Sequence, residues 1–115
     1  RLRPSSHAGR VRGAAEVTKR LRRLMDEGWD IACVRFPLSP ELRAIEDRTV
    51  PPEMLSDIPA SLGLPYRDFG AGEYSTADGS HLTWGASLAF SRTLSVWLIE
   101  EAGWRGPGVA ARTER

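Results

Sequence analysis

The sequence predicts an α/β fold in which parallel strands are covered by helices, the closing part of a three-layer arrangement. Residues 31–34 form a continuous apolar run, which is typical of a strand buried on both faces of a parallel sheet. Apolar side chains recur at helical spacing both before and after this run. The order is helix, strand, two helical segments, strand, loop and helix, as expected when helices connect parallel strands.

The composition limits the chain to one small domain or to part of a larger one. It has 115 residues, of which 41% are hydrophobic and 27% are charged. We expect no membrane span, because no window approaches the roughly 18–20 consecutive apolar residues that a span requires. The single cysteine, Cys33, excludes an intrachain disulfide.

Residues 1–13 are expected to form a flexible basic arm, followed by the first helix and a unit that extends over residues 14–104. The apolar stripe of this helix ends near Gly28, where a C-terminal cap would lie. Residues 1–23 hold eight basic side chains and one acidic side chain, Glu16. We interpret most of this charge as a solvated helix face, and we expect no nucleic-acid partner.

The middle of the chain predicts two strands separated by helices. The first strand covers residues 30–36 and is stopped by Pro37. Ser39 is expected to cap a short helix over residues 40–47. A second helical stripe begins after the extended residues 50–52 and ends at Gly63, with Pro59 expected to kink or split it. Residues 66–69 form the second strand.

A loop over residues 70–80 leads to the longest helix, residues 84–102, which Gly103 closes. Its apolar side contains Ala86, Phe90, Leu94, Trp97 and Leu98. Residues 105–115 have no apolar periodicity and are expected to be a disordered tail. Because two strands alone would leave both sheet edges open, we expect further strands before residue 1.

Asp78 and His81 are the candidate catalytic residues. They lie in the loop that joins the last strand to the last helix, and such loops open at the carboxyl ends of strands, where α/β proteins bind ligands. An aspartate three residues before a histidine can orient the imidazole and stabilise the imidazolium that forms during general base catalysis. Alternatively, Asp78 and Gly79 only form a turn, and Ser80 or Thr83 caps the helix.

Other candidate residues are weaker. We expect Ser80 to have a turn or cap role, since neighbouring side chains point apart. A metal site made from Asp78, His81 and Cys33 would need a third close ligand and supporting contacts, so we predict no metal and no cofactor. Trp84 could flank a substrate cleft, whereas Trp97 is expected to lie in the core.

Residues 14–103 resemble the C-terminal part of an SGNH (GDSL-type) hydrolase. The resemblance rests on a strand ending in Phe36-Pro37, on the second strand after Pro65, and above all on the block Asp78-Gly79-Ser80-His81-Leu82 before a long helix. The chain is especially similar to the DltD-like and alginate-acetylation-like branch, which acts on acyl groups of cell-envelope polymers.

The resemblance implies a flavodoxin-like α/β/α fold and a Ser-His-Asp triad in which His81 is the base and Asp78 the acid. It also implies an acyl ester substrate, possibly on a cell-envelope polysaccharide, and an extracytoplasmic location. The chain departs from the family pattern because it has no Gly-Asp-Ser and no asparagine. The nucleophile would therefore lie before residue 1, and the isolated chain is predicted to be inactive. The alternative is a non-catalytic α/β interaction module whose basic arm binds an acidic partner.

Overall fold

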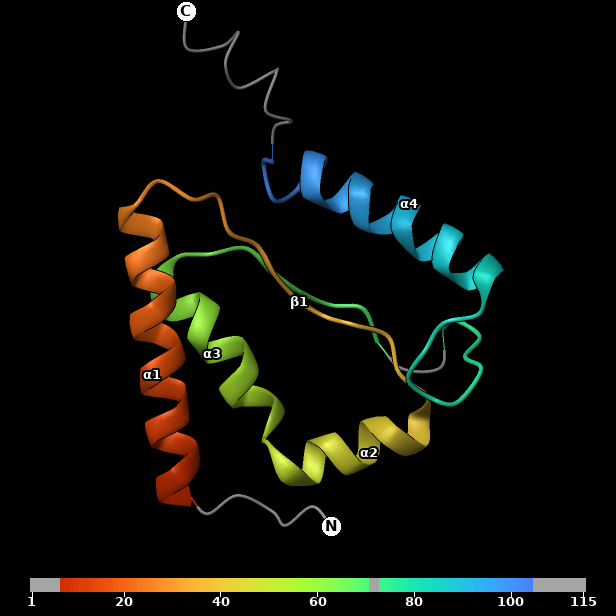
Figure 1. Ribbon diagram of the computed structural model, residues 1–115, viewed down its shortest axis with the longest axis horizontal. Helices are drawn as coiled ribbons and strands as arrows, with labels where there is room; N and C mark the ends of the chain where they lie inside the picture. Colours follow the sequence, from red (N-terminus) through yellow and green to blue (C-terminus); the bar gives the residue numbers. More distant parts are fainter. Residues whose placement is uncertain (1–6, 71–72, 105–115) are drawn as a thin grey trace, which may run out of the picture.

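A computed structural model describes residues 7–70 and 73–104 of the chain (Figure 1). The fold is mixed α/β and mostly helical, with a small two-stranded parallel sheet. In chain order the elements are α1 (His7–Asp26), β1 (Cys33–Arg35), α2 (Pro40–Thr49), α3 (Pro52–Leu62), β2 (Tyr66–Asp68) and α4 (Trp84–Glu100). The predicted α/β class is thus confirmed.

The two strands run between α4 on one side and α1 and α3 on the other (Figure 1). Cys33 of β1 pairs with Tyr66 of β2, and Arg35 pairs with Asp68. Because the strands are parallel, both end at the same edge of the sheet. The segment that leads into α4 passes beside the beginning of α2, so the β1–α2 and β2–α4 connections meet near this edge (Figure 1).

An aromatic cluster holds α4 against the sheet. Phe69, directly after β2, is 3% exposed and packs edge-on against Phe90 and Trp97 of α4, with ring centroids 5.0 and 6.0 Å apart. Ala32 and Val34 contact the same cluster from the side of β1. Burial of each such side chain stabilises the fold by about 1.5–3 kcal/mol. The core positions predicted for Phe90 and Trp97 are confirmed.

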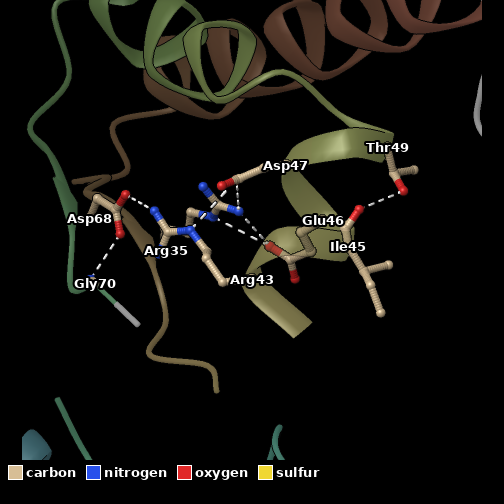
Figure 2. A network of polar contacts seen from close by, with 8 residues as sticks. All are labelled: Arg35, Arg43, Ile45, Glu46, Asp47, Thr49, Asp68 and Gly70. Atoms are coloured by element: carbon tan, nitrogen blue, oxygen red, sulfur yellow. Dashed lines mark hydrogen bonds and ion pairs between the residues drawn. The ribbon is translucent and has the colours of Figure 1, made fainter. Parts of the chain in front are cut away.

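A network of charges lies where β1 and α2 meet (Figure 2). Arg35 is 7% exposed, and its Nη2 donates to Glu46 Oε1 at 3.0 Å and to Asp47 Oδ1 at 2.7 Å. Arg43 of α2 donates to Asp68, the last residue of β2. Successive strand residues point to opposite faces, so Val34 meets the aromatic cluster while Arg35 meets α2. These ion pairs therefore hold α2 against both strands.

The first helix begins earlier than predicted. Residues 7–13, expected as part of a flexible arm, are the start of α1, and residues 1–6 lie outside the described residues. Gly9 and Gly13 favoured a loop, but Val11, Ala14 and Thr18 face α3 across a shared hollow. Contact with α3 stabilises the helix there and outweighs the glycines' low helix propensity.

The strands are shorter and less buried than predicted. Each has three residues, and the residues of β1 before Arg35 are half-buried rather than buried on both faces. α3 runs through the buried Pro59 as one helix, so the expected split does not occur. α4 ends at Glu100, two residues earlier than predicted. The predicted tail lies outside the described residues. Within the described parts of the chain, no helix combines the length and apolar character needed to cross a membrane.

Replacing Arg35 by alanine should destabilise the fold by about 2–3 kcal/mol, measured as the free energy of unfolding in urea. The substitution leaves Glu46 without its cation and Asp47 with Arg43 alone, at 3.6 Å. The loss stays below that of a fully buried pair because both carboxylates keep contact with water.

The matched control is Arg20→Ala on α1. Arg20 is also paired, with Glu16 at 3.3 Å, but its side chain is 76% exposed, and the expected loss is below about 0.5 kcal/mol. Equal losses in the two variants would contradict the role given to Arg35.

Candidate functional site

Residues 75–83, which lead into α4, form a tight hairpin that carries Asp78 and His81 at its tip. Thr76 and Leu82 pair as an antiparallel bridge. Inside it, the Ala77 amide donates to the His81 carbonyl at 2.8 Å, and outside it the Thr83 amide donates to the Ser75 carbonyl at 3.0 Å. Thr83 then caps α4 by accepting from the Ala86 amide at 3.4 Å. The hairpin is thus joined directly to a rigid helix.

The hairpin tip is fixed on the beginning of α2. The Ser39 amide donates to the Gly79 carbonyl at 2.9 Å. Gly79 has a φ of 90°, and a Cβ placed there would lie 3.0 Å from both Leu42 Cδ1 and Ser39 Oγ. Glycine satisfies the backbone conformation and the close approach at once. Ser39 also caps α2, as predicted, by accepting from the Leu42 amide at 3.3 Å.

Asp78 and His81 form a direct pair within this hairpin. His81 Nδ1 lies 2.7 Å from Asp78 Oδ2. An ionised carboxylate can only accept hydrogen bonds, so Nδ1 carries the hydrogen, and Nε2 of the neutral imidazole keeps its lone pair. The His81 side chain is 82% exposed. With its hydrogen on Nδ1 and a lone pair on Nε2, the imidazole has the tautomer and the orientation that a general base needs.

Backbone amides hold the Asp78 carboxylate in place. Its Oδ1 accepts from the His81 amide at 2.7 Å and from the Ser80 amide at 3.0 Å. The hydrogen bond from the His81 amide, then those from the imidazole and the Ser80 amide, keeps the pKa of Asp78 well below its usual range. The carboxylate is therefore ionised wherever the imidazole is neutral.

A hollow of about 410 Å³ lies beside the pair, and we name it the His81 hollow. It is bounded by the residues after β1, by the hairpin and by α4. Its lining residues are Phe36, Pro37, Ser80, His81, Leu82, Ser87, Phe90, Ser91 and Leu94. The sequence analysis did not single out Ser87 or Ser91. Their spacing of four on α4, beside the stripe containing Phe90 and Leu94, is the signal that could have found them.

Of the weaker candidates predicted from the sequence, Ser80 lies beside the Asp78–His81 pair and Trp84 does not line the hollow. Ser80 does not point away from His81, because its Oγ lies 3.2 Å from His81 Nδ1. That nitrogen already faces Asp78, so Ser80 is not placed to be deprotonated by Nε2, and its amide closes the turn. Trp84 is 80% exposed and does not line the His81 hollow.

Among residues 7–70 and 73–104, no three histidine, cysteine or acidic side chains are grouped so that they could hold a metal ion. The structure therefore does not bring Cys33 together with Asp78 and His81. Burial raises the pKa of the half-buried Cys33 thiol. A raised pKa disfavours the reactive thiolate, so Cys33 is a poor nucleophile.

Comparisons of the chain with protein-family models, with curated proteins and with solved structures find no match.

Gly79→Ala should destabilise the fold by about 1–3 kcal/mol, since it adds a contact at 3.0 Å to a backbone with positive φ. The measurement is the free energy of unfolding. Gly63→Ala is the control, because Gly63 also has a positive φ, 69°, but faces open space and should lose only about 1 kcal/mol. Similar losses at both positions would show that the contact with α2 is unimportant.

The carboxyl group of Asp78 should titrate at lower pH in the folded chain than in the urea-unfolded chain, as followed by NMR of the carboxyl carbon. Because folding lowers this pKa, the resulting stabilisation is fully present above the unfolded value, about 3.9, and is lost as the pH falls toward the folded value. Asp78→Asn should remove this part of the acid dependence of stability. If the Asp78 carboxyl titrated at the same pH in the folded and the unfolded chain, the hydrogen bonds described for it would be contradicted.

Proposed function

We propose that this chain is the C-terminal part of an SGNH-like serine esterase or O-acyltransferase with a three-layer, flavodoxin-like α/β/α fold. His81 acts as the general base and Asp78 orients it. The observation that carries the proposal is the 2.7 Å contact between Asp78 Oδ2 and His81 Nδ1, which leaves Nε2 free on an exposed ring. The sequence block around this pair supports the family assignment.

In the proposed reaction, Nε2 removes the proton of a serine hydroxyl while the serine oxygen bonds to the ester carbonyl carbon. Asp78 stabilises the resulting imidazolium. When the carbon–oxygen bond of the ester breaks, Nε2 returns the proton to the departing alcohol, and an acyl-serine remains. Water or a sugar hydroxyl then bonds to the carbonyl carbon of the acyl-serine while Nε2 takes its proton. The bond from that carbon to the serine oxygen breaks, and Nε2 returns the proton to the serine, which gives hydrolysis or acyl transfer.

The serine and the oxyanion donors are proposed to come from sequence before residue 1. Ser80 approaches Nδ1 rather than Nε2, so it does not serve as the nucleophile. The described sheet has two strands, and strands from the preceding sequence would pair with its edges and complete the fold. The site lies at the carboxyl ends of both strands, where such a sheet brings residues of several connections together.

The proposed substrate is an acyl ester, in the acyltransferase case on a cell-envelope polysaccharide, and the proposed location is extracytoplasmic. The resemblance of residues 74–82 to the envelope-acting branch favours this assignment. The pair at Asp78 and His81 serves hydrolysis and transfer equally well, because only the attacking hydroxyl differs between them.

In the full-length protein, His81→Ala should lower kcat for ester cleavage by about 10⁴-fold or more, because the serine loses its base. Asp78→Asn should lower it by about 10²–10⁴-fold, because the imidazole loses its orientation. Hydrolysis of p-nitrophenyl acetate measures both. His7→Ala is the control, since His7 lies on α1 beside α3 and should leave kcat unchanged.

Undiminished activity in His81→Ala would refute the catalytic role of His81, and a full-length protein without esterase activity would favour the interaction module instead. One observation supports that second candidate. No residue of α1 is buried, and Lys19, Arg20 and Arg23 line a shared hollow on it together with Glu16, which pairs with Arg20. Such a surface fits an acidic partner. If the chain is an interaction module, replacing Lys19, Arg20 and Arg23 by glutamate should abolish binding of the acidic partner. If the catalytic proposal is correct, the same replacement should leave esterase activity intact.

A further inference from the structure

We propose that the His81 hollow binds the acyl chain of the ester, and that Ser91 and Leu94 on α4 limit the length of chain that fits. This inference rests on the proposed function and deepens it by assigning one half of the substrate to a named part of the site.

The lining of the hollow suits an uncharged, mainly apolar group. Five of its nine residues are apolar, namely Phe36, Pro37, Leu82, Phe90 and Leu94, and His81 is the single titratable one. Phe36 and Phe90 meet edge to face, with ring centroids 5.4 Å apart, and Phe90 is itself fixed by Phe69. An apolar wall of this rigidity is typical of small-molecule sites, and the volume of about 410 Å³ lies within their usual range of about 300–1,000 Å³.

The position of the hollow matches the acyl side of the reaction. In the proposed acyl-serine, the carbonyl carbon is bonded to the oxygen that hydrogen-bonds to Nε2, so the acyl chain begins within a few bonds of the imidazole. His81 is itself part of the wall of the hollow. A chain leaving the carbonyl carbon toward Phe36 and Phe90 would therefore contact apolar surface from its first methylenes onward.

The polar groups available there argue against a sugar as the occupant. A bound sugar needs several directional partners for its hydroxyls, and carboxylates and side-chain amides commonly supply them. The lining contains neither, and its polar side chains besides His81 are Ser80, Ser87 and Ser91. Asp78 does not line the hollow, and both of its oxygens are already hydrogen-bonded. The alcohol half of the ester is therefore placed outside the hollow.

The test compares Ser91→Leu with Ser95→Leu in the full-length protein. Both serines are exposed on α4 one turn apart, but Ser91 lines the hollow and Ser95 does not. The measurement is kcat/KM for p-nitrophenyl acetate, butyrate and hexanoate. Leucine at 91 should fill part of the hollow and lower the ratio of hexanoate to acetate by about tenfold or more. Leucine at 95 should leave the ratio within about twofold of the wild type.

Equal chain-length profiles in the wild type and in Ser91→Leu would overturn the acyl assignment, and so would equal shifts in the two variants. If His81→Ala still abolishes cleavage in that case, the proposed function stands and only the subsite fails. If His81→Ala retains activity, the subsite falls with the function on which it rests. Leu94→Ala supplies an independent check, because enlarging the hollow should move the preference toward longer chains.

Discussion

The contact of Phe69 with Phe90 and Trp97 is the constraint on which the position of the site depends. Phe69 directly follows the second strand, and the other two rings belong to α4. These contacts fix both ends of the segment between the strand and the helix, so this segment must cross the edge of the sheet where both strands end. The hairpin that carries Asp78 and His81 lies at that edge for this reason, and Tyr74 adds to its attachment by packing on Phe90.

Within the hairpin, the geometry of the Asp78–His81 pair is local. The carboxylate of Asp78 is held by two amides that lie two and three residues further along the chain, and the imidazole completes the same turn. Such an arrangement needs little support from distant residues, apart from the close contact of Gly79 with the start of α2. The hollow is different, because its walls come from three separate segments. The pair depends on local contacts, whereas the shape of the hollow depends on tertiary packing.

Much of this arrangement could be predicted from the sequence, where local chemistry decides the structure. Ser39 and Gly63 mark helix ends because a side-chain oxygen and a left-handed backbone act over only a few residues. The spacing of Asp78 and His81 likewise predicts that their side chains meet, whereas their catalytic role stays a prediction. The start of α1 could not be predicted, since it depends on contact with α3. Nor could the burial of Arg35, because its partners on α2 lie 11 and 12 residues away.

The burial of Arg35 has a consequence for how the sheet assembles. Along β1, Val34 faces the rings of α4 and Arg35 faces the carboxylates of α2. A slip of β1 by a single residue would press the guanidinium against Phe69 and Phe90 and leave the carboxylates opposite an aliphatic side chain. Without the buried Arg35, a shifted register of so short a strand would be only slightly less stable than the native one, because few hydrogen bonds are lost when the strand shifts. The buried cation makes them unfavourable, so one charge selects the native alignment during folding.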